Sequence, residues 1–276
     1  MQAHERAVER GCQAMQVFNQ SPRMWRPTRW KPDDVAEFLS LRKSSPVRSV
    51  TIHAVYLINP ATKDREMRKK SAASLIHALR MGDEIRADGV VLHPGSTVGE
   101  PHEEALPRVG EMLKHALDES ERCPLLLENT AGAGNTLGRS FEELREAIDL
   151  AGGHKRIGLC LDSCHMLASG FDITTADRLG EVIDRCVEIV GAKRLKCLHV
   201  NDSLTPLGSN RDRHAIPGEG ELGPRGCAAF LSEPRFEGLP ALFEGPGTSG
   251  HAPDKVDVDR LKELRRNGLR ARRRRG

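Results

Sequence analysis

The stretch RIGLCLD, residues 156–162, is a short apolar run that begins with an arginine and ends with an aspartate. Similar runs, rich in Val, Ile or Leu and bounded by Pro, Gly or charged residues, recur along the chain. Short continuous apolar runs are typical of parallel strands that are buried on both faces. The predicted strands are AMQVFN (14–19), SVTIHAVY (49–56), GVVLHPG (89–95), PLLLEN (124–129), RIGLCLD (156–162), LKCLHV (195–200) and LPALFE (239–244).

The segments between these runs are longer and charged, with helical spacing of their apolar residues, as in residues 65–88 and 140–152. Strand followed by helix, repeated, predicts an α/β fold built from right-handed βαβ units. A closed TIM-type barrel has eight strands, but seven runs are present, and AHERAVERGC (3–12) reads as a helix. We therefore expect a TIM-type (β/α)8 barrel that lacks its first strand and occupies residues 1–264.

The composition is that of an ordinary globular protein with enough apolar residues for a sizeable core. No apolar run approaches the roughly 20 residues that span a membrane, and the first residues lack the apolar core of a signal peptide. The seven cysteines are odd in number, and no two form a CxxC pair. They are typical of reduced thiols in the cytosol. We expect a cytoplasmic protein with no membrane partner.

The last twelve residues, 265–276, contain seven arginines and no acidic residue. Without them the formal net charge of the chain falls from +3 to −4. A basic end on an acidic body suggests an anionic partner, although an unfolded, solubilising end has the same composition. We expect residues 265–276 to form a basic, disordered tail.

Six of the seven runs end at or near a residue that can bind a metal ion, and these residues are 34 to 45 positions apart. That spacing is about one βα unit, so the side chains gather at the carboxyl end of the strands, where barrel active sites lie. Buried carboxylates without partners are costly, and a cation offsets both their desolvation and their mutual repulsion. The six are His53, His93, Glu128, Asp162, His199 and Glu244.

A polar loop, LHVNDSLTPLGSNRDRHAIPGEG (198–220), adds Asp212 and His214, and His165 follows Asp162 by three residues. Nine imidazole and carboxylate donors are more than one ion needs. A donor set without thiolate suits Zn²⁺, with Mn²⁺ or Fe²⁺ as alternatives. Several zinc ions together suit phosphoester cleavage, because they activate water and stabilise developing negative charge.

These residues lie in segments that resemble the endonuclease IV family, the zinc-dependent apurinic/apyrimidinic endonucleases with xylose-isomerase-like barrels. The resemblance covers about residues 3–246. The segments that carry it are IHAVYLIN, LHPGS, LENTAGAGNTLG, CLDSCHMLASGFD, HVNDS, GSNRDRH, GEGELG and FEGP.

The resemblance implies three zinc ions per chain and a catalytic role for Glu128 and Glu244. It implies hydrolysis of the phosphodiester bond on the 5′ side of an abasic site, leaving 3′-hydroxyl and 5′-deoxyribose phosphate ends. It further implies double-stranded DNA as the substrate, with Arg23, Tyr56 and Leu57 filling the gap left by the flipped nucleotide. We expect the protein to act as a monomer. The implied ligands are His53, His93 and Glu128 for one ion, Asp162, His199 and Glu244 for a second that Glu128 bridges, and His165, Asp212 and His214 for the third.

Two other readings of the sequence remain open. A metal-dependent sugar isomerase or epimerase of the same fold uses Glu, Asp, His and Glu, like Glu128, Asp162, His199 and Glu244, but has no need of a further donor set. A truncated barrel that binds nucleic acid without cleaving it is the second alternative. Fold alone does not separate these functions.

Overall fold

The computed structural model describes residues 2–274, which divide into two compact units. One unit consists of residues 2–128, 135–138 and 143–158, and the other of residues 129–134, 139–142 and 159–274. Both units repeat the predicted order of strand and helix, and each of the seven apolar runs contains a strand. No strand precedes Ala14 within the described residues, where the expected helix α1 is found instead.

The first unit contains four parallel strands, each paired with the next in chain order. They are β1 (Ala14–Phe18), β2 (Ser49–His53), β3 (Gly89–Leu92) and β4 (Leu125–Glu128). Every residue of β3 and β4 is buried, which agrees with the expectation of strands covered on both faces. The helices that precede or connect these strands are α1 (Gln2–Glu9), α2 (Pro32–Ser44), α3 (Arg65–Ile85) and α4 (His102–Asp118).

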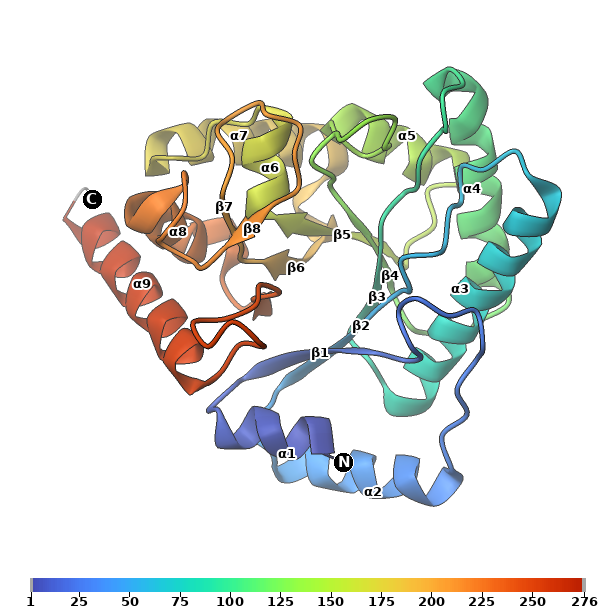
Figure 1. Cartoon of the computed structure of the whole chain (residues 1–276), viewed down its shortest axis with the longest axis horizontal. Coiled ribbons are helices and arrows are strands. Elements are labelled where there is room, and N and C mark those ends of the chain that lie inside the picture. Colours follow the sequence, from blue (N-terminus) through green and yellow to red (C-terminus); the bar gives the residue numbers. More distant parts are fainter. Residues whose placement is uncertain (1, 275–276) are drawn as a thin grey trace. The chain divides into compact units, whose positions relative to one another are not determined.

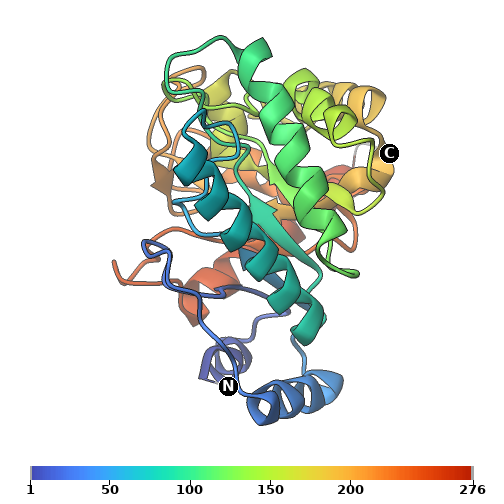
Figure 2. The ribbon, with the colours of Figure 1, turned by 90° about the vertical axis from the view of Figure 1, so that its right-hand side faces the viewer.

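Helix α3 packs on β2 and β3 and lies beside α4 (Figure 2). The helix begins where the side chain of Asp64 accepts a hydrogen bond from the backbone N–H of Met67, which satisfies one of the exposed donors of the first turn. It buries Leu75, Ala78 and Leu79, three apolar side chains at helical spacing. Strand β2, on which α3 packs, ends at His53.

The second unit holds three strands of a parallel sheet and a short antiparallel hairpin. Strand β6 pairs with β5 and with β9, and β7 pairs with β8. Strand β5 and helix α5 have residues in both units. The remaining elements are α5 (Phe141–Leu150), β5 (Ile157–Asp162), α6 (Ser163–Ser169), α7 (Ala176–Val190), η1 (Ala192–Arg194), β6 (Leu195–His199), β7 (Asp202–Ser203), β8 (His214–Ala215), α8 (Gly223–Ser232), η2 (Pro234–Phe236), β9 (Ala241–Leu242) and α9 (Lys255–Arg273).

Residues 265–273 of the expected disordered tail are instead the second half of helix α9, which runs beside α8 (Figure 1). The last two residues of that tail, 275–276, lie outside the described residues. The helix starts at a capping box formed by Asp254 and Asp257. It buries Leu264 and Gly268, and an added Cβ at Gly268 would lie 2.1 Å from the carbonyl oxygen of Ala228. Composition could not show this contact, because it depends on the small residues of another helix. That residues 1–264 form one domain stays a prediction.

Two arginines of the expected tail also hold α9 to the backbone of α8. Arg265 donates to the carbonyl oxygen of Leu231 at 2.7 Å, and Arg272 donates to that of Ser232 at 2.6 Å. These carbonyls belong to the last turn of α8, whose acceptors have no partners within their own helix. The arginines therefore complete the end of α8 while they anchor α9.

Substitution of Gly268 by Ala tests whether α9 is docked. In an exposed helix this change gains up to about 1 kcal/mol, because Ala has the higher helix propensity. Here the methyl group clashes with Ala228 and Ser232, so we expect a loss of about 1–3 kcal/mol in the free energy of unfolding. Urea denaturation measures this difference.

Gly180→Ala is the matched control, since an added Cβ in the middle of α7 meets only the far end of the Arg235 side chain, at 4.0 Å. We expect the control to be neutral or stabilising. Equal stabilisation by both substitutions contradicts the docked helix.

Candidate metal centre

In the first unit, two histidines surround the carboxylate of Glu128. Glu128 ends β4 and is fully buried, His53 ends β2, and His93 follows β3 directly. Oε2 of Glu128 lies 3.3 Å from Nε2 of His53 and 3.1 Å from Nε2 of His93. One donor atom from each residue lies within 4.8 Å of the others, so the three can bind a single cation.

The ring of His53 is held in one tautomer. Its Nδ1 lies 2.7 Å from the carbonyl oxygen of Ala54, which can only accept a hydrogen bond, so Nδ1 carries the proton. In the neutral ring, Nε2 then directs its lone pair toward the carboxylate of Glu128. A lone pair facing a buried carboxylate is unfavourable, and a cation between them reverses the sign of the interaction.

In the second unit, Asp162 performs two tasks at the junction of β5 and α6. Its Oδ1 accepts the backbone N–H of His165 at 2.7 Å and so caps α6. Its Oδ2 lies 3.9 Å from Nδ1 of His199 and 3.9 Å from Nε2 of His214. Because Asp162 is completely buried, the ionised carboxylate depends on these neighbours for its stability.

Asp212 lies between His165 and His214. Its two oxygens are 3.3 Å from Nε2 of His165 and 3.2 Å from Nε2 of His214. The hairpin of β7 and β8 sets this position, because Ser203 pairs with His214 across it. Asp212 and His214, which lie two residues apart in the polar loop, therefore lie close together beside His165.

The ring of His165 is held in one tautomer, as the ring of His53 is. Its Nδ1 donates to the carbonyl oxygen of Asn129 at 3.0 Å, so in the neutral ring Nε2 presents a lone pair to Asp212. Partial burial acts to raise the pKa of Asp212, but hydrogen bonds from the His165 and His214 rings, which His165 can donate only when its ring is protonated, outweigh burial and hold that pKa well below its usual range. Asp212 is thus an anion beside two imidazoles.

His199 and Glu244 complete the donors of the second unit. Nδ1 of His199 lies 3.0 Å from Oε2 of Glu244, and the imidazole is completely buried. Glu244 follows β9 by two residues, so strand pairing between β6 and β9 brings it to His199. The structure therefore gathers all nine predicted ligands into close groups, with three in the first unit and six in the second.

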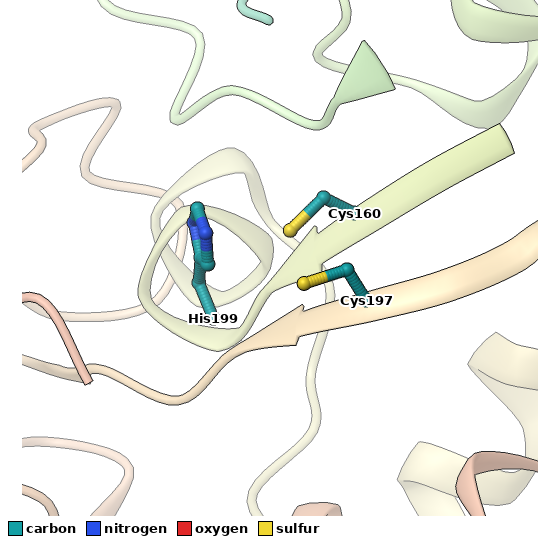
Figure 3. A group of neighbouring side chains, drawn as sticks. All are labelled: Cys160, Cys197 and His199. Atoms are coloured by element: carbon teal, nitrogen blue, oxygen red, sulfur yellow. The ribbon is translucent and has the colours of Figure 1, made fainter. Parts of the chain in front are cut away.

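Two cysteines also lie close to His199, which the sequence did not predict (Figure 3). Cys160 and Cys197 are register partners on β5 and β6, each two residues before a ligand, so they share its side of the strand. Their sulfurs and a ring nitrogen of His199 lie within 4.8 Å of one another, and both cysteines are buried. Because Nδ1 of His199 faces Glu244, we assign His199 to the carboxylate set.

A third cysteine, Cys164, lies near Asp212 and His214. Its thiol donates to the carbonyl oxygen of Arg213 at 3.7 Å. Burial, together with the negative charge of Asp162, raises the pKa of Cys164 to about 12. In the absence of a cation, burial thus favours the neutral thiol of Cys164.

Two asparagines that sequence reasoning missed orient the ligands. Asn201 donates from Nδ2 to Oδ2 of Asp162 at 2.5 Å and to Glu244 at 3.4 Å, and its Oδ1 accepts the N–H of Glu244 at 3.0 Å. Asn129 exchanges two hydrogen bonds with the backbone of Asp162. The available signal was position, since each lies one or two residues after a ligand.

Asp202, the other acidic residue of the polar loop, does not belong to the metal centre. Its buried carboxylate accepts backbone N–H groups of the glycine-rich turn and of Ser203, and the four from the turn belong to Gly218, Gly220, Leu222 and Gly223. At Gly220, an added Cβ would lie 2.3 Å from the carbonyl oxygen of Ser203. Asp202 thus anchors the turn, and the need for glycine at residue 220 is steric.

The three residues predicted to contact DNA lie on two neighbouring loops of the first unit. The N–H of Tyr56 donates to the carbonyl oxygen of Pro22, directly before the exposed Arg23. Tyr56 is 58% exposed and its ring centroid is 5.4 Å from that of His53, while Leu57 is half-buried. A large exposed aromatic ring beside a metal ligand is available to a bound molecule.

Asn201→Ala tests the positioning of the carboxylates. Removing the amide leaves Asp162 and Glu244 without a shared donor, so we expect metal affinity to fall by about 10–100-fold. Competition with a chelator of known affinity measures the change. Asn267→Ala, at an exposed site on α9, is the control. Unchanged affinity in Asn201→Ala contradicts the assigned role.

Comparisons with known proteins agree with this geometry. Residues 5–266 match the family profile described as Xylose isomerase-like TIM barrel, which confirms the predicted fold class. The chain is 37% identical over 266 residues to a "Probable endonuclease 4" of Halothermothrix orenii, covering 96% of this chain and 95% of that protein. A protein of the same name from Streptomyces avermitilis is 38% identical, over 94% of this chain and 84% of its own length.

Comparison with solved structures is consistent with these sequence matches. Endonuclease IV from Thermus thermophilus superposes with a TM-score of 0.84 at 34% identity, over 98% of this chain and 94% of that one. A D-tagatose 3-epimerase-like protein has a TM-score of 0.71 at 20% identity, over 97% and 92% of the two chains, which shows a shared fold alone. The chain belongs to the endonuclease IV family and is an apurinic/apyrimidinic endonuclease, a hydrolase of DNA repair.

Proposed function

We propose that the protein hydrolyses the phosphodiester bond 5′ to an abasic site in double-stranded DNA with three zinc ions, leaving 3′-hydroxyl and 5′-deoxyribose phosphate ends. The observation that carries the proposal is the cluster of His165, Asp212 and His214 beside Asp162. A sugar isomerase or epimerase has no use for this additional donor set. Family membership supports the substrate class.

The residues present fit zinc. Every donor is an imidazole or a carboxylate, and the tautomers of His53 and His165 leave Nε2 of each ring able to coordinate. Manganese or iron fits the same donors. When bound, such ions lower the pKa of a coordinated water to near 7 and offset charge on the phosphate. The bridging role that the resemblance implies for Glu128 stays a prediction.

The chain's own residues orient the reaction. Asn201 and Asn129 hold Asp162 and Glu244 in place, so little reorganisation is needed when substrate binds. Glu244 keeps part of its side chain exposed, and we assign it the task of orienting a water or holding a proton. Four ligand carboxylates bring four negative charges, and three divalent ions make the centre net positive toward phosphate.

Tyr56, Leu57 and Arg23 are proposed to occupy the space left by a flipped abasic nucleotide. Flipping is least costly where no base is stacked or paired, which favours abasic sites over intact DNA. The exposed ring of Tyr56, close to His53, supports this placement. We further propose that the protein acts as a monomer in the cytoplasm. No helix among residues 2–274 is long and apolar enough to cross a bilayer.

The deciding experiment is incubation of zinc-loaded protein with a duplex carrying one tetrahydrofuran abasic analogue, with and without a chelator. The analogue cannot undergo β-elimination, so strand cleavage reports hydrolysis. We expect a 3′ end that a polymerase extends, and loss of cleavage with chelator. No cleavage, or cleavage that chelator leaves unchanged, contradicts the proposal.

Glu128→Gln in the same assay tests the role of the buried carboxylate between two histidines. Its loss leaves His53 and His93 without their anionic partner, so we expect cleavage to fall at least about 100-fold, together with metal content. Glu111→Gln, an exposed glutamate of α4, is the control. A Glu128→Gln protein that retains activity within about tenfold of wild type rules out the role.

A further inference from the structure

Helix α9 has a basic outer face that the catalytic proposal does not use. Its exposed arginines other than Arg272 are Arg266, Arg270 and Arg273, and the exposed Arg274 follows the last residue of the helix. At about 100° per residue, all four lie on the side of the helix opposite Gly268, which packs on α8. We call these four residues the arginine face.

The arginine face differs from the arginines that have structural tasks. Arg265 and Arg272 bind carbonyl groups at the end of α8, and Arg260 pairs with Glu219. None of the four arginines of the face forms an ion pair with another side chain in the part of the chain described here. Their charges are therefore available to a partner.

Helix stability accounts for only part of this arrangement, because Arg270 and Arg273 lie in the last turn but Arg266 does not. Cations favour the last turn of a helix, where the dipole acts. Arg270 faces Arg266 and Arg274 at spacings of four residues, and like charges at this spacing destabilise a helix. Docking against α8 holds the helix in spite of this repulsion, so the charges are fixed in a preformed array.

We propose that the arginine face binds the phosphate backbone of duplex DNA, as a contact surface separate from the metal centre. The four side chains span about 12 Å along the helix axis, because each residue rises about 1.5 Å. Over that length one DNA strand presents about three or four phosphates. Guanidinium groups suit phosphate because their planar fork donates two parallel hydrogen bonds. The choice of DNA as the anion rests on the proposed function.

The two halves of α9 differ in the charge on their outward side. The outward positions of its first half carry Lys255, Asp259 and Glu263, with Lys255 paired to Asp259, whereas those of its second half carry the arginines. The first half has no surplus of positive charge, so we expect only the carboxyl-terminal half to contact the backbone. Backbone contacts carry no base specificity, and we expect the surface to bind intact and abasic duplexes equally.

The test compares wild-type protein with R266Q/R270Q/R273Q/R274Q on an intact duplex that has no abasic site. Each phosphate contact contributes about 0.9 to the slope of log affinity against log salt concentration. We expect the slope to fall by about 2 to 3.6 in the four-site variant, as two to four contacts are lost. Glutamine keeps helix propensity, and circular dichroism checks that α9 remains folded.

The control is R6Q/K155Q/K193Q/K196Q, which removes the same charge from four exposed positions outside α9. We expect its slope to stay within about one contact of wild type. A similar decrease in both variants, or no decrease in the α9 variant, overturns the proposal. If the four-site variant does not fold, R270Q alone is measured and must lower the slope by about 0.9. An unchanged slope in R270Q also overturns the proposal.

Cleavage of abasic duplex at low salt separates this proposal from the catalytic one. We expect the four-site variant to cleave at the wild-type rate under saturating conditions, because the metal centre is untouched. Wild-type protein that binds intact duplex through α9 but cleaves no abasic DNA contradicts only the catalytic proposal. Wild-type protein that cleaves, with a salt slope independent of the arginine face, contradicts only this one.

Discussion

The buried carboxylate of Asp162 is the constraint on which the second unit's site depends. One oxygen caps α6 and so fixes the position of His165, while the other faces His199 and His214. Removal of an ionised carboxylate from water costs several kcal/mol unless partners replace the water. Asn201 supplies one hydrogen bond, and the remaining requirement explains why imidazoles from two other segments converge there.

Asp202 shows the alternative solution to the same physical problem. It is as buried as Asp162, but backbone N–H groups of the glycine-rich turn surround it. Five backbone donors satisfy this carboxylate without any metal ion. Around Asp162, Glu128 and Asp212 the neighbours are imidazole nitrogens. In the neutral rings of His53 and His165, whose Nδ1 carries the proton, Nε2 presents a lone pair. The kind of neighbour, more than burial, distinguishes a structural carboxylate from a metal ligand.

The sequence predicted much of this arrangement because its signals are periodic. Apolar runs marked all seven parallel strands, and the βα interval placed a ligand at the end of six of them. Asn201, Asn129 and the anchoring role of Asp202 escaped prediction, because each depends on which backbone groups lie nearby in three dimensions. Composition likewise predicted a disordered tail where α9 folds, since the contact of Gly268 with Ala228 leaves no trace in local sequence.

We propose that cations bound only by imidazole and carboxylate groups balance these buried anions. X-ray absorption at the zinc edge of the metal-loaded protein tests it most directly, because sulfur ligands lie at about 2.3 Å and nitrogen or oxygen ligands at about 2.0–2.2 Å. Cys160 and Cys197 lie near His199, and Cys164 lies near His214. Sulfur ligands are therefore an alternative that this measurement can detect. We predict a shell of nitrogen and oxygen alone. A sulfur contribution, or a protein that retains no metal, contradicts the account.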